Sequence, residues 1–226
     1  MKTDIKKIIS SFSAVADTVY GPAYRHPPES HAFFSTVLQA ALSQIAAPPP
    51  IRVLEIGCGN GYWLRAIAQM AAEMGPVVDL RGVDVTPALI DLAKEALKDL
   101  APAPALSVGD LLKGDIAGRY HLCYAYDVVQ QIDRWDHGLI FTNVRSLLKE
   151  GGVFVVLDRD PCSRYGISMN LRKVLTRRLS LRLVPDFYLL ARYPSFRRLA
   201  RLARRAGFEV VNDLCGASRR ALVLKL

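Results

Sequence analysis

Residues 53–64 have the sequence VLEIGCGNGYWL, in which a short apolar run passes through a glycine-rich turn into a helix-like segment. The glycines Gly57, Gly59 and Gly61 let the backbone turn tightly and approach a ligand without a clash from a Cβ atom. In open α/β sheets, ligands bind where such strands end. The G-x-G-x-G spacing differs from the G-x-G-x-x-G spacing of dinucleotide-binding folds. The segment predicts a strand, a turn and a helix with a ligand site at the turn, and a tight turn without a ligand is the alternative.

Strand-like and helix-like segments alternate through the rest of the chain. Strands are expected at residues 51–56, 77–85, 105–108, 120–127, 153–158, 208–211 and 220–226, and helices at 62–74, 87–100, 138–149 and 195–205. This alternation predicts a doubly wound α/β fold, with a mostly parallel seven-stranded sheet and helices on both faces. The last two strands have no helix between them, so the final strand is expected to run antiparallel.

Two segments are additional to this alternating core. Residues 1–50 carry apolar positions at helical spacing over 3–19 and a second expected helix over about 29–45, and the three prolines 48–50 end this helical segment. Residues 159–194 connect the fifth strand to the next helix and exceed a minimal connection. They mix aliphatic and aromatic side chains with arginine and lysine, which predicts a helical insertion.

The positive charge of the chain is concentrated in one region. The net charge is +9. Residues 159–205 contain thirteen arginines and lysines and two acids, so this region sums to +11 and the rest of the chain to −2. The basic surface is therefore expected on the insertion and on the helix that follows it.

Several classes of protein are disfavoured by composition. No apolar stretch approaches the roughly 20 residues needed to cross a bilayer, and no continuous apolar region of a secretory signal follows the basic start. The four cysteines, Cys58, Cys123, Cys162 and Cys215, are scattered and show no metal-ligand spacing. We expect a cytoplasmic protein with reduced thiols and no metal site.

The segment VLEIGCGNG resembles the first motif of the class I S-adenosylmethionine-dependent methyltransferase family. Five further segments resemble later motifs in the family's order: GVDVT at 82–86, VGDL at 108–111, HLCYAYDVVQQI at 121–132, LLKEGGVFVV at 147–156 and AGFEV at 206–210. The resemblance covers about residues 51–226, the expected methyltransferase domain. It implies that S-adenosylmethionine is the cofactor and methyl donor.

The resemblance also implies which residues bind the cofactor. An acid at the end of the second strand, here Asp84, can accept hydrogen bonds from both ribose hydroxyls, and a helix N-terminal acid is its alternative role. The full set of expected cofactor-binding residues is Glu55, Gly57, Cys58, Gly59, Gly61, Asp84, Val85, Asp110, Leu111, Tyr126 and Asp127.

The chain departs from the family pattern at two places in the fourth motif. His121 stands where an aspartate is usual, and Gln130 and Gln131 stand where a pair of histidines is common. Glutamine donates and accepts hydrogen bonds but does not titrate, so this pair is not expected to supply acid–base chemistry.

Methyl transfer from a sulfonium is a direct displacement, so the enzyme mainly aligns the nucleophile with the methyl group. A nucleophile that must lose a proton also benefits from a base. The candidates for that catalytic role are His26, His31, Asp127 and His137, and an ordinary packing or surface role is the alternative for each histidine. The expected substrate contacts are Tyr20, Tyr24, Gln130, Gln131, Arg159 and Tyr165.

In similar enzymes both additional segments close over the site, so residues 1–50 are expected to form a lid and 159–194 a substrate cap. The abundance of aliphatic side chains favours a small-molecule acceptor with a large apolar part, methylated on oxygen or nitrogen. The basic insertion could also rest on an anionic membrane surface. An RNA methyltransferase is the alternative, disfavoured because few aromatic residues interleave with the arginines. A scaffold that binds the cofactor without catalysis is a further alternative.

Overall fold

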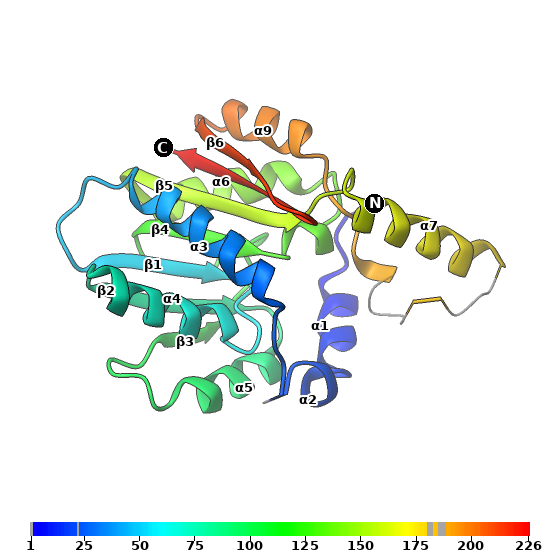
Figure 1. The fold of residues 1–226 in the computed structure, drawn as a ribbon, viewed down its shortest axis with the longest axis horizontal. Helices are drawn as coiled ribbons and strands as arrows, with labels where there is room; N and C mark the ends of the chain where they lie inside the picture. Colours follow the sequence, from blue (N-terminus) through cyan, green and yellow to red (C-terminus); the bar gives the residue numbers. More distant parts are fainter. Residues whose placement is uncertain (1, 22, 180–182, 185–188) are drawn as a thin grey trace.

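The computed structural model describes residues 2–21, 23–179, 183–184 and 189–226 of the 226-residue chain. Within these residues, seven strands form one sheet in the order β3-β2-β1-β4-β5-β7-β6 (Figure 1). The strands are β1 (Ile51–Ile56), β2 (Val78–Asp84), β3 (Ala105–Val108), β4 (Tyr120–Tyr126), β5 (Leu148–Arg159), β6 (Glu209–Cys215) and β7 (Arg219–Lys225). Strands β1 to β5 pair in parallel, and β7 runs antiparallel to both β5 and β6. The predicted sheet and its antiparallel last strand are confirmed.

The helices lie close to their predicted ranges. They are α1 (Ile5–Ser13), α2 (Ala16–Val19), α3 (Pro28–Leu42), α4 (Tyr62–Met74), α5 (Pro87–Leu97), α6 (His137–Leu147), α7 (Arg164–Leu179) and α9 (Phe196–Arg205), with a 3₁₀ turn η1 (Val129–Gln131). The one helix predicted over residues 3–19 is instead divided between α1 and α2. Val15 interrupts it, because its backbone leaves the helical region at φ −117° and ψ 4°.

The sheet is buried on both faces, because strand side chains alternate between two apolar clusters. In β4, Leu122 and Tyr124 pack in the cluster that includes α3 and α4. Cys123 and Ala125 pack in the opposite cluster, which includes α6 and α9. Near-continuous burial of this kind explains why the strands are apolar runs rather than alternating patterns.

Helix α3 belongs to the core rather than to a lid. Phe34, Val37, Leu38 and Ala41 are buried in the same cluster as β1, β4 and β5 side chains. The prediction that all of residues 1–50 form a separate lid therefore needs correction. The prolines at 48–50 lie in a connection between two parts of one core, whereas the described residues before α3 belong to neither apolar cluster.

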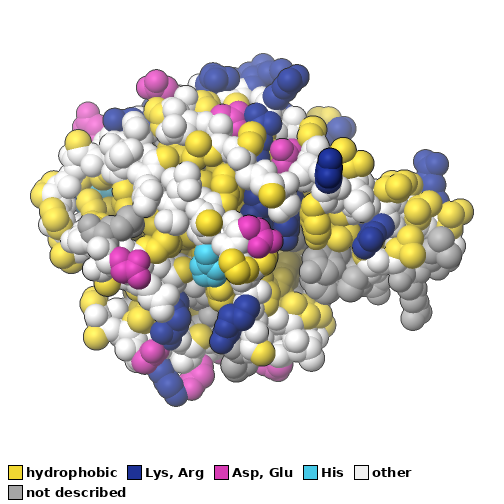
Figure 2. All heavy atoms as spheres, viewed as in Figure 1, with side chains coloured by type: hydrophobic (Ala, Val, Ile, Leu, Met, Phe, Trp, Pro, Cys, Tyr) yellow, Lys and Arg dark blue, Asp and Glu magenta, His cyan; other side chains and the backbone are white. Residues whose placement is uncertain are grey.

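Two parts of the chain lie at the carboxyl ends of the parallel strands, namely the α1–α2 segment and the start of the insertion (Figure 1). Helix α7 extends away from the body of the molecule there. Hydrophobic and basic side chains share the surface of this projecting part (Figure 2). Residues 180–182 and 185–188 of the predicted insertion lie outside the described residues. Among the described residues, no helix has the length and apolarity needed to cross a membrane.

Candidate active site

A cavity of about 370 Å³ opens at the carboxyl ends of the parallel strands. The glycine-rich turn after β1 forms one wall, and Gly57 and Gly59 both have left-handed backbones, with φ of +71° and +52°. A Cβ atom on Gly59 would meet nothing within 4 Å, so it would enter the open space of the cavity. A Cβ atom on Gly57 would lie 2.4 Å from Cγ2 of Val128. The two glycines thus have different roles, since Gly57 makes room for Val128 and Gly59 makes room for a ligand.

The end of β2 supports the same turn through Asp84. Its side chain is buried, and its Oδ2 accepts a hydrogen bond of 3.0 Å from the Gly59 N–H. Its Oδ1 accepts one of 2.8 Å from the Thr86 N–H at the start of α5. Burial raises the pKa of Asp84. A carboxylate has about four acceptor positions, so Asp84 can hold the turn and still accept hydrogen bonds from a ligand.

Glu55 is a second buried acid beside the cavity. It lies near the end of β1, and its Oε2 has no hydrogen-bond partner among the described residues. Burial raises the pKa of Glu55 well above its usual range. Buried polar atoms are normally paired, so Oε2 of Glu55 is an atom that a bound ligand could satisfy.

Most of the predicted cofactor residues line this one cavity. They are Glu55, Gly57, Cys58, Gly59, Asp84, Val85, Asp110, Leu111, Tyr126 and Asp127. Gly61 does not line it. Gly61 precedes α4, and a Cβ atom there would lie 2.6 Å from Cδ1 of Leu97, so this glycine permits close packing of α4 against α5.

Beyond β4 the cavity wall contains a buried ion pair that the sequence did not reveal. Arg219, at the first position of β7, is 3 % exposed, and its Nη1 lies 2.6 Å from Oδ1 of Asp127. The guanidinium also lies 4.3 Å from the centre of the Tyr126 ring. Asp127 has a left-handed backbone at φ +59°, a conformation that aspartate tolerates better than most residues. The ion pair holds the Asp127 side chain at the cavity wall.

The antiparallel register explains why Arg219 reaches the cavity. β7 begins where β5 ends, and Arg219 pairs directly with Arg159. The signal that could have located Arg219 was the predicted antiparallel final strand, whose first residue must lie at the edge where its parallel neighbours end.

Gln130 and Gln131 both line the cavity, on the short turn η1. The fully buried carboxylate of Asp158 accepts hydrogen bonds from the backbone N–H groups of Val129 and Gln130, at 3.1 and 3.4 Å. The side-chain oxygens of both glutamines are buried without a hydrogen-bond partner among the described residues. Asp158 therefore holds the turn through its backbone, and each glutamine that lines the cavity has one buried acceptor without a partner among the described residues.

The predicted catalytic histidines are not brought together. His26 lines the cavity, shares a hydrogen bond of 3.1 Å with Tyr24 Oη, and has its ring centre 4.7 Å from that of Trp63. Burial, followed by the charge of Arg219, lowers the pKa of His26 to about 3. Within this cavity, His26 is therefore neutral and a weak base.

His31 and His137 lie outside the cavity. His31 shares a hydrogen bond with Tyr62 Oη and lines a separate cleft. His137 is buried at the start of α6, where its Nε2 donates to the Ile132 carbonyl oxygen at 3.1 Å. The prediction that His137 is a catalytic candidate is corrected, because its side chain packs inside the fold and secures the turn before α6.

The predicted substrate residues Tyr20, Tyr24, Arg159 and Tyr165 all line the cavity. The structure adds an apolar stripe from α1, made of Ile5, Ile8 and Phe12, together with Trp63, Ala191 and Tyr193. The stripe follows helical spacing, so one face of α1 covers the cavity.

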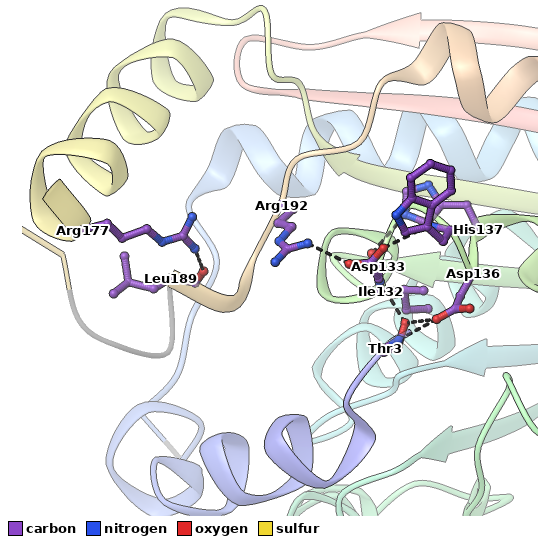
Figure 3. Close-up of polar contacts among 9 residues, drawn as sticks. Thr3, Ile132, Asp133, Asp136, His137, Arg177, Leu189 and Arg192 are labelled. Atoms are coloured by element: carbon purple, nitrogen blue, oxygen red, sulfur yellow. Dashed lines mark hydrogen bonds and ion pairs between the residues drawn. The ribbon is translucent and has the colours of Figure 1, made fainter. Parts of the chain in front are cut away.

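Polar contacts join α1 to the end of the insertion through the turn before α6 (Figure 3). The backbone N–H and the hydroxyl of Thr3 both donate to Asp136 Oδ2, at 2.6 and 2.7 Å. The Thr3 hydroxyl also accepts a hydrogen bond of 2.9 Å from the Asp133 N–H, and Asp133 Oδ2 lies 2.8 Å from Nη1 of Arg192. Thr3 is therefore held by Asp133 and Asp136, and Arg192 is held by Asp133.

Comparison with known proteins assigns a family to this architecture. A family model described as a methyltransferase domain matches residues 29–213. A malonyl-[acyl-carrier protein] O-methyltransferase of Anoxybacillus flavithermus is 37% identical over 59 residues, which are 26% of this chain and 21% of that protein. A non-reducing polyketide synthase of Penicillium brasilianum is 25% identical over 128 residues, which are 54% of this chain and 5% of that protein. The matches thus span about a fifth or less of the length of these curated relatives.

Solved structures share the whole fold. A magnesium protoporphyrin IX methyltransferase from Synechocystis PCC 6803 with bound SAH has a TM-score of 0.72 at 15% identity, covering 98% of this chain and 99% of that one. The N-methyltransferase NodS from Bradyrhizobium japonicum WM9, in complex with S-adenosyl-L-homocysteine, has a TM-score of 0.66 at 16% identity, covering 96% and 97%. Because the family model spans most of the chain and the sheet has the same architecture, this chain belongs to the methyltransferase domain family, as a class I S-adenosylmethionine-dependent methyltransferase.

Proposed function

We propose that this enzyme methylates a small molecule with a large apolar part, on oxygen or nitrogen, within the cavity at the carboxyl ends of the strands. One observation carries the proposal. A single cavity is lined by the turn after β1, by the buried acids Glu55 and Asp84, and by the apolar face of α1. A donor and an apolar acceptor can therefore lie side by side in the same space.

The cofactor side of the proposal rests on three features of this chain. Gly59 leaves space that a Cβ atom would fill, Asp84 has acceptor positions beyond those that hold the turn, and Glu55 has an unpaired buried oxygen. We assign these groups and Asp110 to S-adenosylmethionine, which supplies an activated methyl group when bound. A ligand with a cationic amine and hydroxyl donors suits such a set of acceptors.

The acceptor side rests on α1 and on the insertion. Ile5, Ile8 and Phe12 present an apolar face to the cavity, and Tyr165 and Tyr193 line it from the insertion. Apolar walls with a few polar groups are typical of small-molecule sites. We propose that α1, α2 and the insertion close this side as lid and cap, held together by the contacts of Thr3 and Arg192 with the turn before α6.

A peripheral membrane role for α7 is part of the same proposal. Ile167, Leu171 and Val174 are spaced along one side of the helix and are 60%, 57% and 47% exposed. Arginines at 164, 172, 177 and 178 belong to the same helix. The apolar and basic side chains are not segregated to opposite faces of α7, so a contact with an anionic lipid surface would rest mainly on its positive charge. An apolar acceptor could be delivered from such a surface.

Two measurements test the proposed function. Calorimetry should detect S-adenosylmethionine binding, and a panel of apolar acceptors should reveal methyl transfer. Replacement of residues 163–190 by a short Gly-Ser linker should preserve cofactor affinity and remove methyl transfer. Near wild-type transfer by that variant would refute the cap. Cofactor binding without turnover on any acceptor would favour a scaffold role.

A further inference from the structure

Two arginines meet on the acceptor side of the cavity. Arg159, the last residue of β5, and Arg219, the first residue of β7, are direct partners in the antiparallel register. Both line the cavity. The acids that we assign to the cofactor line the same cavity near the ends of β1 and β2, and the chemistry of the arginine wall limits which acceptors can bind.

The charges of this wall do not cancel. Arg219 is paired with Asp127. Asp158 does not supply a second full counter-charge, because burial and then the neighbouring charge of Asp127 raise its pKa well above its usual range. Arg159 donates to Ser218 Oγ at 3.0 Å and lies over the Tyr165 ring, and it has no ion pair with an acid among the described residues. The wall therefore carries one positive charge in excess.

Apart from the ion-paired Asp127, the titratable side chains described beside this wall are poor bases for an acceptor that must lose a proton. Burial and then the charge of Arg219 lower the pKa of His26 to about 3. Burial raises the pKa of Tyr126 and Tyr193. Gln130 and Gln131 do not titrate. General-base catalysis works best when the pKa of the base lies near the working pH. These groups are therefore weak bases for an alcohol or an amine that must be deprotonated.

We infer that the acceptor is an apolar carboxylic acid, bound as its carboxylate by Arg159 and converted to a methyl ester. The inference rests on the proposed function of the cavity. A carboxylate is already ionised at neutral pH, since model carboxyl groups have pKa values of about 4, and a guanidinium binds it with charge-assisted hydrogen bonds. The apolar remainder of the acid lies against Ile5, Ile8 and Phe12 of α1.

The reaction balances without a proton transfer. A lone pair on one carboxylate oxygen forms the new bond to the methyl carbon as the bond from that carbon to sulfur breaks. The electron pair of the broken bond stays on sulfur, which changes from a cationic sulfonium to a neutral thioether. One negative and one positive charge are therefore removed together, and the products are a methyl ester and S-adenosylhomocysteine. Arg159 keeps the carboxylate in place for this displacement, and the buried pair of Arg219 with Asp127 maintains the shape of the wall.

The first test compares ligands that differ only in the polar group. The full-length protein, saturated with S-adenosylhomocysteine, is titrated with medium-chain and aromatic carboxylic acids and with the primary amide and the alcohol of each skeleton. We expect the acids to bind about tenfold more tightly than the matched amides or alcohols, as a charge-assisted hydrogen bond allows. Equal or tighter binding of the neutral ligands would overturn the inference.

The second test uses labelled S-adenosylmethionine with the same panel. Methyl transfer to acids should give a product that releases labelled methanol on mild alkaline hydrolysis. A base-stable ether or methylamine as the main product would contradict the inference but leave the proposed methyltransferase function intact. Loss of S-adenosylmethionine binding in the wild-type protein would instead refute the proposed function.

Variants of Arg159 test whether this residue binds the carboxylate. Arg159→Gln should weaken acid binding about tenfold and leave amide binding and S-adenosylmethionine affinity unchanged. Arg159→Lys keeps the charge and should recover part of the loss. Within the described residues, Arg159 makes one side-chain hydrogen bond, to Ser218 Oγ, and one contact with the Tyr165 ring, so the melting temperature should change little in both variants. Equal loss of acid and amide binding in Arg159→Gln would indicate a structural role and overturn the assignment.

Discussion

The two halves of the cavity are built in different ways. The cofactor half comes from short segments that each directly follow a parallel strand, namely Gly57 and Gly59 after β1, Asp84 at the end of β2 and Asp110 after β3. The acceptor half combines the end of β5, the segment after α7 and the start of β7, and α1, which contacts α5, covers the cavity. Local sequence therefore determines the first half, whereas chain register and packing over long distances determine the second.

The halves also differ in charge. Glu55, Asp84 and Asp110 are acids on the cofactor side, and Arg159 and Arg219 are the cations on the acceptor side. An anionic acceptor would face the positive charge of Arg159, whereas the cationic donor would meet the acceptor oxygens of the cofactor side, which favours binding in one orientation. If the two halves are separable, a change in one half should leave ligand binding by the other half intact.

The largest effect is expected for Gly59→Val. The valine would place a branched side chain in the open space of the cavity and at a left-handed φ of +52°, which such residues avoid. We expect no measurable S-adenosylmethionine binding by calorimetry. Gly75→Val is the matched control, because Gly75 also has a left-handed φ of +93° and open space around its Cβ position, but it ends α4 away from the cavity. The control should retain cofactor binding. Gly57→Val is a poorer test, since that side chain would collide with Val128 and distort the turn itself.

Breaking the buried ion pair between Arg219 and Asp127 should strongly lower the free energy of unfolding. Arg219→Met leaves Asp127 without its partner, and we expect the free energy of unfolding to fall by roughly 3 kcal/mol. The double variant Arg219→Met/Asp127→Asn should recover part of this loss, because no uncompensated charge remains. Denaturant unfolding of the wild type, both single variants and the double variant measures the coupling. Additive losses would show that the pair does not act as a unit.

A smaller effect on binding is expected at the end of β2. Asp84→Asn keeps the shape of the side chain but removes a charged acceptor, and it should weaken S-adenosylmethionine binding by about 1–3 kcal/mol. Asp79→Asn serves as the control, since Asp79 lies at the start of the same strand in a partly exposed pair with Arg52. Carboxylate binding on the acceptor side should be unchanged in both variants. A loss of acid affinity in Asp84→Asn would contradict the separation of the halves.

The pH dependence of the reaction tests the role of His26. The charged and titratable groups around its ring are Tyr24, His31, Tyr62, Tyr126, Asp127, Arg159 and Arg219. With its pKa lowered to about 3, His26 stays neutral, so kcat/KM should be constant between about pH 6 and pH 7.5 rather than fall near the ordinary histidine value of about 6.5. A fall in kcat/KM below about pH 6.5 that is present in the wild type and absent in His26→Gln would show that His26 is the base.

The same lowered pKa has a consequence for stability. Between about pH 6.5 and pH 3, the unfolded chain binds a proton at His26 that the folded protein does not, so the contribution of His26 makes the free energy of unfolding fall as the pH falls through this window. Unfolding of the wild type and His26→Gln across this range measures that contribution. A variant with the same pH slope as the wild type would contradict the lowered pKa.

The contrast between the halves also explains what could be predicted from the sequence. The glycine turn, Asp84 and Asp110 each follow a recognisable strand, so their place in one cavity could be predicted from motif order. Arg219 could not be selected from thirty basic residues without the register of β7 against β5. The roles of the histidines could not be predicted from residue type, because burial and hydrogen-bond partners decide them. Thr3 and Arg192 approach the same turn only in the folded chain.

The smallest effect is expected on the outer surface of the insertion. If α7 rests on a membrane, the protein should sediment with vesicles of anionic phospholipid and not with vesicles of neutral phosphatidylcholine. Each basic side chain near such a surface contributes about 1 kcal/mol, so Arg172→Gln should weaken the association roughly fivefold, and Ile167→Ser, which removes an apolar contact, should weaken it by a similar amount. Lys94→Gln, in an exposed pair with Asp91 on α5, is the matched charge control and should have little effect. Cofactor affinity should be unchanged in all three variants, because α7 side chains at 167 and 172 do not line the cavity.

Equal binding to both kinds of vesicle would refute an electrostatic membrane contact. Tight, salt-dependent binding of RNA that Arg172→Gln weakens instead would assign the basic region to nucleic acid.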